Sequence, residues 1–421
     1  MPRGTRRFAE RGRIGPFPAW AVVALVAVVL IGGGVAFAVS GSSDNSDNSD
    51  KSGKPPVNAA PGQSAPPPVS SAAAAGCAEQ LVGKLSLEQQ AAQLLMIGTP
   101  LSSPLGAAQT IQKYHIGGIF LAGRSSASAA TLRQQIAQLQ DAAKQNGGTA
   151  LQIGIDQEGG QVQTLKGDDF PAIPTAVNQG KLDNATLKAR TAEWAALLKG
   201  IGITIDLAPV ADVVPADVGK NNPPIGGFER QYGSTPDPVA DDVATVVQAI
   251  QGAGVLTTLK HFPGLGRVRV NTDTSTGAQD AVMTTDDPFL KPFSSGLTAG
   301  SAAVMISSAT YPKLDAKNVA AFSQPIVTGL LREKLGFNGL VLSDDLGAAV
   351  AVGSTPVGQR AVKFIQAGGD MALSVRLADA APMTEALVTA AKADPAFAAR
   401  VKQSATRVLQ SKIQAGLASC G

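Results

Sequence analysis

The sequence predicts an α/β fold in which one (β/α)8 TIM-type barrel occupies residues 77–421. Three observations support this fold class. Eight short apolar runs, rich in β-branched residues, are bounded by glycine or polar residues, as expected for buried strands. Segments with the apolar spacing of helices lie between them, and strands that alternate with helices form a parallel sheet covered by helices. Eight such repeats within 345 residues fit a closed barrel.

The predicted elements follow one another in a regular order. Strands are expected at LLMIG (from residue 94), GGIFLA (117), LQIGID (151), GITIDLAPV (202), VLTTLKHF (255), AAVMISS (302), GLVLSDD (339) and MALSV (371). Helical spacing is clearest over 128–144, 186–198, 238–253 and 325–335. An open doubly wound sheet is the alternative arrangement, but no GxGxxG motif follows any of the strands.

The first 76 residues predict an arm that precedes the barrel. Residues 1–17 are basic and are expected in the cytoplasm, and the uncharged apolar run 18–39 is long enough to span a bilayer as a transmembrane helix or signal anchor. The Ala-Phe-Ala at 36–38 resembles a cleavage site, so secretion after cleavage is the alternative. Residues 40–76, rich in Ser, Asp, Pro and Ala, predict a disordered linker. The barrel is therefore expected outside the cell membrane.

The charge distribution argues against a nucleic-acid partner. Residues 1–76 hold seven of the 35 Lys and Arg and four of the 32 Asp and Glu, so the remaining chain has no net charge. The basic character belongs to the N-terminal arm, and a neutral domain without basic blocks lacks the footprint of a nucleic-acid binder.

Cys77 and Cys420 are the only cysteines, and they lie at opposite ends of the predicted domain. Two cysteines in an exported domain predict a disulfide. A barrel sets its first and last strands side by side, so a bond between the two ends of the domain is geometrically reasonable.

Four of the predicted strands end in polar residues. Catalytic groups of such barrels lie at the carboxyl ends of the strands, so we expect these side chains to face one opening. They are Asp156 after the third strand, Lys260 and His261 at the end of the fifth, Ser307 and Ser308 after the sixth, and Asp344 and Asp345 after the seventh.

This combination of side chains favours carbohydrate chemistry. It lacks the sulfur and imidazole ligands of a zinc site, and there is no GxSxG motif. With two histidines in the whole chain, a Ser-His-Asp triad is not expected. Cleavage of a glycoside needs one carboxylate to attack or stabilise the anomeric centre and one proton donor. Asp344 is the candidate nucleophile, and Lys260 and His261 suit sugar hydroxyls.

The chain resembles glycoside hydrolase family 3, in particular its single-barrel N-acetyl-β-glucosaminidases. The resemblance covers roughly residues 78–415. Its motifs are IGIDQEGGQVQ (153–163), IDLAPVADV (205–213), ERQYGS (229–234), KHFPG (260–264), MISSATYPKLD (305–315), IVTGLLREKLGFNGLVLSDDLG (326–347) and AGGDMAL (367–373).

The resemblance implies a retaining mechanism with Asp344 as nucleophile. It also implies a sugar-binding set of Asp156, Arg230, Lys260 and His261, and chemistry that needs no metal or organic cofactor. The expected substrates are terminal β-N-acetylglucosamine residues, such as those of peptidoglycan fragments or related glycans. We expect the protein to act as a monomer.

The match breaks where the proton donor is expected. The family carries Asp-x-His in the loop after KHFPG, whereas this chain has Ser275 in place of the histidine and keeps Asp273. Asp273 could itself serve as the acid if burial raised its pKa. Arg267 and Arg269 in the same loop would oppose this if they lay close. The arginine that is usual after DQEGG is replaced by Gln161.

Two hypotheses therefore remain open. The protein is either a glycosidase with an atypical and weakened acid, or a non-catalytic relative that keeps the sugar-binding residues as a recognition module for a glycan or a cell wall. They share almost every residue, so the sequence does not separate them.

Overall fold

Eight parallel strands form the centre of the protein, in the chain order that the sequence predicts. The structure is a computed structural model, and it describes residues 71–420. The strands are β1 (Leu95–Pro100), β2 (Gly118–Ala122), β3 (Gln152–Ile155), β6 (Ile205–Asp206), β7 (Leu256–Phe262), β8 (Ala303–Ile306), β11 (Leu340–Ser343) and β12 (Ala372–Ser374). Their order is β11-β8-β7-β6-β3-β2-β1-β12, and a parallel bridge between Leu342 and Met371 joins the two ends. The predicted barrel is confirmed, with one junction made by a single bridge.

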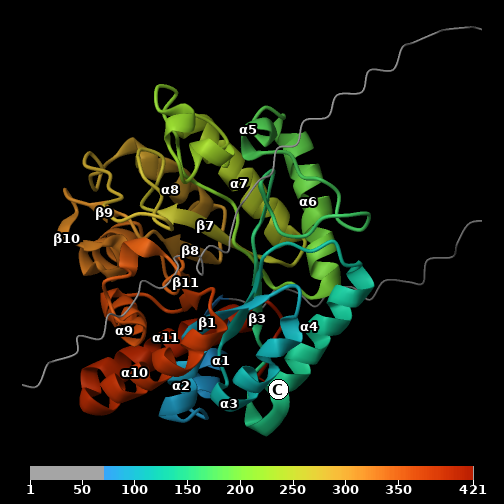
Figure 1. Ribbon diagram of the computed structural model, residues 1–421, viewed down its shortest axis with the longest axis vertical. Helices are drawn as coiled ribbons and strands as arrows, with labels where there is room; N and C mark the ends of the chain where they lie inside the picture. Colours follow the sequence, from blue (N-terminus) through green and yellow to red (C-terminus); the bar gives the residue numbers. More distant parts are fainter. Residues whose placement is uncertain (1–70, 421) are drawn as a thin grey trace, which may run out of the picture. The chain divides into compact units, whose positions relative to one another are not determined.

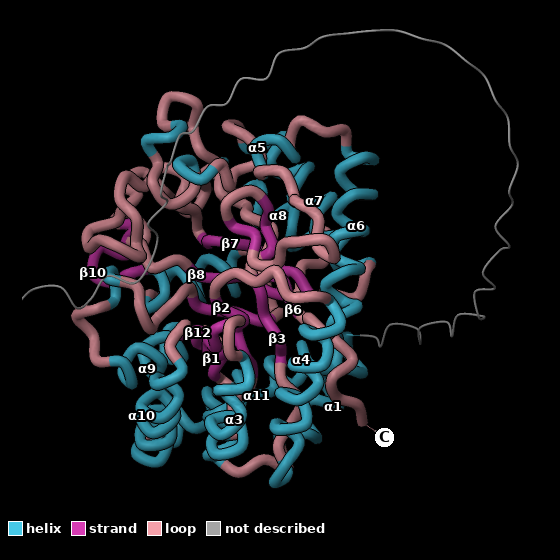
Figure 2. The backbone as a smooth tube through the Cα atoms, turned by 45° about the vertical axis from the view of Figure 1, so that its right-hand side comes forward, coloured by secondary structure: helices cyan, strands magenta, loops and turns pink. Residues whose placement is uncertain are grey.

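Helices surround this sheet on its outside (Figures 1 and 2). The α-helices are α1 (Ser71–Val82), α2 (Leu87–Gln93), α3 (Ala108–Tyr114), α4 (Ala129–Lys144), α5 (Ala176–Gln179), α6 (Asn184–Ile201), α7 (Pro236–Gly252), α8 (Lys291–Thr298), α9 (Val357–Ala367), α10 (Ala380–Ala393) and α11 (Pro395–Gln414). The 3-10 turn used below is η8 (Val350–Val352). Two small antiparallel pairs, β4 (Gln157–Gly159) with β5 (Val162–Gln163) and β9 (Thr310–Tyr311) with β10 (Asp315–Val319), lie in the connections that follow β3 and β8.

Three of the four helices with the clearest spacing begin with recognisable signals. Ser128 accepts a hydrogen bond from the N–H of Thr131 ahead of α4, and Asp183 accepts one from Thr186 ahead of α6. Helix α7 has Pro236 at its first position, where the missing N–H has no helical partner to lose.

Two segments differ from the expectations. Pro325–Lys334 (η7) is a π-helix, in which the N–H of Leu335 bonds to the carbonyl oxygen of Leu330, five residues back. Helix α1 begins at Ser71, so residues 71–76, which were expected in the linker, are helical. Alanine has the highest helix propensity, and four alanines at 72–75 favour this extension.

Alternate strand residues fill the barrel and pack against the helices. Along β1, Met96 belongs to the cluster inside the barrel, whereas Leu95 and Ile97 pack in the larger cluster between strands and helices. The inner cluster also contains Phe120, Ile205, Leu207, Leu256, Ala303, Met305, Leu340, Leu342, Met371 and Leu373. Because this interior is packed, a ligand can enter only at an open end of the barrel.

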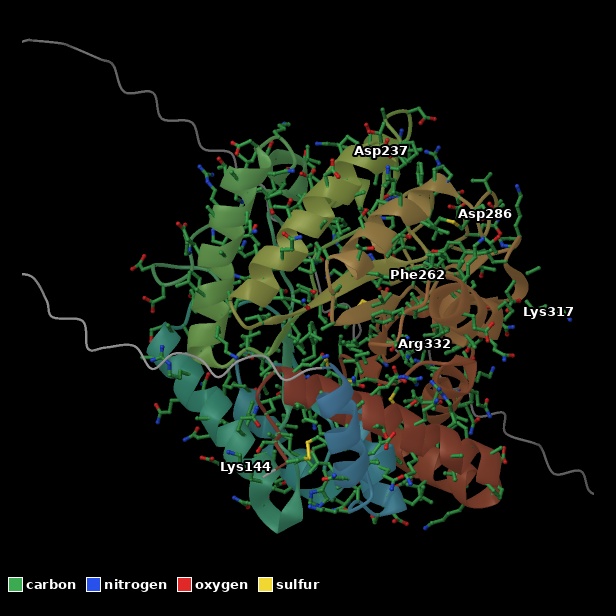
Figure 3. All side chains as sticks on the ribbon, turned by 180° about the vertical axis from the view of Figure 1, so that it is seen from behind. Lys144, Asp237, Phe262, Asp286, Lys317 and Arg332 are labelled. Carbon is green, nitrogen blue, oxygen red and sulfur yellow. A yellow bond between two sulfur atoms is a disulfide. The ribbon has the colours of Figure 1, made fainter. Side chains whose placement is uncertain are left out.

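The predicted disulfide between Cys77 and Cys420 is present, with its partners 343 residues apart in sequence. Cys77 lies in α1, which packs along the last helix, α11. Figure 3 shows the bond in yellow beside α1. It ties the two ends of the barrel domain together, and a loop of this length corresponds to about 5 to 6 kcal/mol at most in the chain-entropy model.

The predicted cytoplasmic segment (1–17) and transmembrane run (18–39), and all of the linker before residue 71, lie outside the described residues. Within residues 71–420, no helix is both long enough and apolar enough to cross a bilayer. Attachment to a membrane therefore stays a prediction.

Candidate active site

A cavity of about 330 Å³ lies at the carboxyl ends of the barrel strands. Its apolar floor includes Phe120, Leu207 and Met305, which belong to the core inside the barrel. All six residues predicted to act or to bind a sugar contribute to its lining. They are Asp156, Arg230, Lys260, His261, Asp273 and Asp344.

These side chains come from the ends of three strands and from two of the connections that follow strands. Asp156 directly follows β3, Lys260 and His261 are near the end of β7, and Asp344 directly follows β11. Arg230 lies in the connection between β6 and α7. Parallel strands of a barrel all end at the same rim, and this is why residues distant in sequence meet at one cavity.

The serines that follow β8 do not line the cavity, contrary to the expectation. The hydroxyl oxygens of Ser307 and Tyr311 are 2.9 Å apart, and the Tyr311 hydroxyl donates to the carbonyl oxygen of Gly264 at 2.9 Å. Ser307 and Ser308 are both buried. Ser307 thus supports the Pro-Gly turn after β7, and three of the four polar strand ends reach the cavity.

An ion-pair network centred on Glu158 forms one side of the site. Lys260 Nζ is 2.5 Å from Glu158 Oε1 and 2.6 Å from Asp156 Oδ1. Arg230 binds the same glutamate with two bonds, from Nε to Oε2 at 2.8 Å and from Nη2 to Oε1 at 2.7 Å. The side chains of Lys260 and Glu158 are buried, whereas that of Asp156 is 28% exposed. Asp156 is therefore the most accessible carboxylate of the network.

The charges of this network balance. Burial disfavours the charged form of Glu158, but Arg230 and Lys260 outweigh it and lower the pKa of Glu158 to about 2. Burial likewise disfavours the charge of Lys260, yet Asp156 and Glu158 raise its pKa. Burial raises the pKa of neighbouring Asp206 to about 7, so below neutrality this carboxyl is mostly uncharged. Two cations then face two carboxylates.

Asp212 fixes the orientation of His261. His261 Nδ1 is 2.7 Å from Asp212 Oδ2, and the other carboxylate oxygen accepts the N–H of Leu265 at 2.7 Å. On the opposite side of the ring, Arg230 Nη2 is 3.3 Å from His261 Nε2. Because an arginine side chain only donates, we assign Nε2 as the acceptor and place the proton on Nδ1. These two contacts hold the ring in one orientation at the cavity wall.

The adjacent aspartates after β11 have different surroundings. Asp345 accepts the backbone N–H groups of Gly347, Ala348 and Val375, so its carboxylate organises the loop. Asp344 accepts only the N–H of Asp345 among the hydrogen bonds of the described residues, and it lines the cavity. Asp344 is therefore the member of the pair that is free to meet a ligand.

Asp273 belongs to the loop between β7 and α8. The residue as a whole is exposed, but it lines the cavity that also holds Asp344, and the surroundings of its carboxyl group there differ from open solvent. Burial of its carboxyl group and the negative charge of Asp344 raise its pKa to about 6, although the positive charge of Arg230 acts in the opposite direction. A carboxyl group with a pKa near the working pH can donate and accept a proton, which is what an acid/base catalyst requires.

Arg267 does not oppose this shift in the way the sequence suggested. Its guanidinium is 2.6 Å from Asp287 Oδ1 and 3.1 Å from Asp280 Oδ2, and it lies 3.8 Å from the centre of the Phe289 ring. These contacts direct Arg267 toward the start of α8. The positive charge that acts most strongly on Asp273 comes instead from Arg230.

Two residues differ from the family's motifs, Ser275 in place of a histidine and Gln161 in place of an arginine, and neither lines the cavity. Ser275 is half-buried, and its N–H donates to the carbonyl oxygen of Asn271 at 2.9 Å. Gln161 is exposed, and its carbonyl oxygen accepts a bond from Arg124. His115 ends α3 and precedes the amino end of β2, at the end of the barrel opposite to the cavity. Within the described chain, no group of three or more His, Cys, Asp or Glu is placed to hold a metal ion.

Sequence reasoning missed two residues of the site. Glu158 and Asp212 are buried carboxylates that hold Lys260, Arg230 and His261 in place. Both follow predicted strands within motifs that were recognised, so the signal that selected Asp156, a carboxylate at a strand end, would also have found them.

Replacement of Glu158 by glutamine is expected to destabilise the fold by about 3 to 5 kcal/mol, because it leaves Arg230 and Lys260 enclosed with one carboxylate fewer. The folded-state pKa of Glu158 is lowered from 4.5 to about 2. Its stabilising effect is therefore present above pH 4.5 and is lost as the pH falls toward 2. The difference in Tm between parent and variant should shrink over that range.

Glu229→Gln is the matched control, since Glu229 pairs with Lys220 at the surface, where their side chains are 34% and 77% exposed. Such pairs contribute little, so the Tm of this variant should match that of the parent. Thermal unfolding followed by circular dichroism from pH 7 to pH 3 measures both. Equal Tm values for Glu158→Gln and the parent at pH 7 would contradict the assigned role of Glu158.

Comparisons with known proteins match most of the described residues. The model of the glycosyl hydrolase family 3 N terminal domain matches residues 86–411. A beta-hexosaminidase from Xanthomonas axonopodis pv. citri is 32% identical over 286 residues, which are 66% of this chain and 80% of the relative.

Solved structures give the same result. The crystal structure of a beta-N-acetylhexosaminidase from Beutenbergia cavernae has a TM-score of 0.76 and 44% identity, over 78% of this chain and 99% of that one. A family 3 beta-N-acetylglucosaminidase from Paenibacillus has a TM-score of 0.72 and 29% identity, over 80% of this chain and 64% of that one. The chain therefore belongs to glycosyl hydrolase family 3, where it resembles the β-N-acetylhexosaminidases.

Proposed function

We propose that the protein is a retaining β-N-acetylglucosaminidase that removes terminal amino sugars from glycans, with Asp344 as nucleophile and Asp273 as acid and base. The observation that carries this proposal is that both carboxyl groups line one cavity while their environments separate their roles. Asp344 is free to attack, and its negative charge helps to keep a proton on Asp273.

The cavity suits one sugar ring. Its volume of about 330 Å³ is near the lower end of the range of about 300 to 1,000 Å³ that is typical of small-molecule sites. Asp156, Lys260, His261 and Arg230 offer carboxylate oxygens and N–H groups along one side, as a ring with several hydroxyl groups requires. The apolar floor, with Phe120, suits the carbon face of the ring.

The reaction then has two steps. In the first, Asp344 attacks the anomeric carbon, the glycosidic bond breaks, and Asp273 gives its proton to the leaving oxygen. In the second, water attacks the anomeric carbon of the ester on Asp344, Asp273 takes a proton from that water, and the carboxylate of Asp344 is released. Two inversions return the original configuration.

We also propose that this domain acts outside the cell membrane, held by residues 18–39 and the linker, or released after cleavage. The disulfide between Cys77 and Cys420 supports an oxidising compartment. In such a place, terminal N-acetylglucosamine of peptidoglycan fragments is the proposed substrate, and we expect the protein to act as a monomer.

One observation favours a second candidate, a non-catalytic sugar-binding protein. Among the described residues, His261 is the only histidine that lines the cavity, and Asp212 and Arg230 hold it in place. If Asp273 transfers protons poorly, the site binds the sugar without cleaving it.

The configuration of the product tests the proposal. The full-length protein is mixed with an aryl N-acetyl-β-glucosaminide, and proton NMR follows the first sugar released. We expect the β-anomer to form first and the α-anomer to follow by mutarotation. First release of the α-anomer would exclude the retaining mechanism. No turnover, together with binding of N-acetylglucosamine in calorimetry, would support the second candidate instead.

A further inference from the structure

The loop that carries Asp273 is docked onto the barrel rim at two places. This acid loop comprises residues 265–278 and follows the KHFPG motif. Its residues Leu265, Val268, Thr272 and Ala278 are buried, so the loop packs inward along its length although Asp273 itself is exposed.

Asn222 fastens the base of the acid loop. Its side chain is fully buried, and its amide nitrogen donates to the carbonyl oxygens of Leu265 and Val268, each at 2.7 Å. Its amide oxygen accepts the N–H groups of Ile225 and Gly226 at 3.0 and 2.8 Å. Both donors and both lone pairs of the amide are thus used. The residue joins the acid loop to the connection that carries Arg230.

Backbone bonds fasten the tip of the acid loop. The N–H of Val350 donates to the carbonyl oxygen of Asp273 at 3.2 Å, and the N–H of Ala351 donates to that of Thr272 at 3.0 Å. The side chain of Asn271 accepts the N–H of Asp273 at 2.8 Å. Val350 and Ala351 belong to η8, which follows Asp344 in the connection after β11. The backbone of Asp273 is therefore bonded to the connection that begins with Asp344.

We propose that the Asn222 side chain and the Val350 backbone amide are positioning groups that hold Asp273 against Asp344 for proton transfer. The inference rests on the proposed function. Neither group touches the substrate. Both act by fixing the backbone of the acid loop, so that the carboxyl group is already placed when the glycosidic oxygen arrives.

Loss of the hydrogen bonds from either the Asn222 side chain or the Val350 amide has two consequences. The acid is displaced from the leaving oxygen, and a misplacement of about 1 Å can cost about 10²-fold in rate. In addition, an Asp273 that moves toward solvent loses its burial and the repulsion of Asp344, so its pKa falls. Cleavage needs protonated Asp273, and the alkaline limb of the kcat/KM profile should therefore shift to lower pH.

The amide of Val350 can be removed without a change in the rest of the site. Val350 begins η8 and is 41% exposed. Ala349 before it has φ −59° and ψ 126°, an extended backbone conformation that is compatible with a proline at the next position. Val350→Pro deletes the N–H that binds Asp273, whereas Val350→Ala keeps it. The pair differs mainly in this one hydrogen bond.

The test compares kcat/KM for two substrates. N,N′-diacetylchitobiose needs acid catalysis, whereas an activated aryl glycoside needs little acid catalysis. We expect Val350→Pro to lose about 10- to 100-fold on the disaccharide relative to Val350→Ala, with a smaller loss on the aryl glycoside and an acid shift of the alkaline limb. Asn222→Ala should do the same relative to Asn221→Ala, because Asn221 is exposed.

Each outcome decides the matter. Equal losses on both substrates with an unmoved pH limb, or no loss in Val350→Pro, would overturn the positioning role. If Asn222→Ala does not fold, Val350→Pro alone carries the test, because Val350 is exposed. An inactive parent would instead refute the proposed function, and the two failures are thereby separated.

Discussion

Replacement of Asp344 by asparagine is expected to lower kcat/KM for an activated aryl N-acetyl-β-glucosaminide by about 10⁴-fold or more. An amide oxygen is a far weaker nucleophile than a carboxylate, and no other carboxylate replaces it at the end of β11. Asp345 cannot do so, because three backbone N–H groups hold its oxygens. Steady-state kinetics of the purified full-length variant measures the loss, and an activated substrate isolates nucleophilic attack from acid catalysis.

Asp345→Asn is the matched comparison for this prediction. An amide in place of the carboxylate turns one acceptor into a donor that faces a backbone N–H, so this variant should lose about 1 to 2 kcal/mol of stability. Asp344→Asn should keep the Tm of the parent. A fluorinated glycosyl donor should label the peptide that contains Asp344 in the parent but not in Asp344→Asn. Label on another residue, or unchanged turnover, would remove Asp344 from the proposed role.

The barrel could be predicted because its signals are local. Each strand is a short apolar run, and the spacing between runs leaves room for one helix. Asp156 and Asp344 could be found for the same reason, since each stands directly after a strand and the fold sends all strand ends to one rim. The predicted linker runs six residues too far, over 71–76, because alanines after a polar segment carry no apolar pattern.

The supporting contacts could not be predicted in this way. The Asn222 side chain donates to the carbonyl oxygens of Leu265 and Val268, which lie 43 and 46 residues later in the sequence. No sequence pattern around Asn222 predicts these partners. Arg267 lies six residues from Asp273 in sequence, yet its charge is taken up by Asp280 and Asp287. The pKa of Asp273 therefore depends on which neighbours the folded loop leaves beside it, and sequence distance does not give that information.

Replacement of Asp273 by asparagine is expected to lower kcat/KM for N,N′-diacetylchitobiose by about 10² to 10⁴-fold, the usual contribution of a general acid. The loss on an aryl glycoside with a good leaving group should be much smaller, because such a group departs without a proton. Asp286→Asn is the control, since Asp286 is a surface residue paired with Lys334. A similar loss on both substrates would mean that Asp273 is not the acid.

The pH dependence gives an independent measure of the same role. Asp273 must be protonated in the first step, and its pKa in the folded protein is about 6. The parent should therefore lose kcat/KM for the disaccharide as the pH rises through 6, and Asp273→Asn, which cannot titrate there, should lack this limb.

Asp273→Ala should also turn over the aryl glycoside faster with azide, because a small anion attacks the ester on Asp344 without a base. A limb near pH 6 that survives in Asp273→Asn would assign the proton to another group and remove Asp273 from the proposed role.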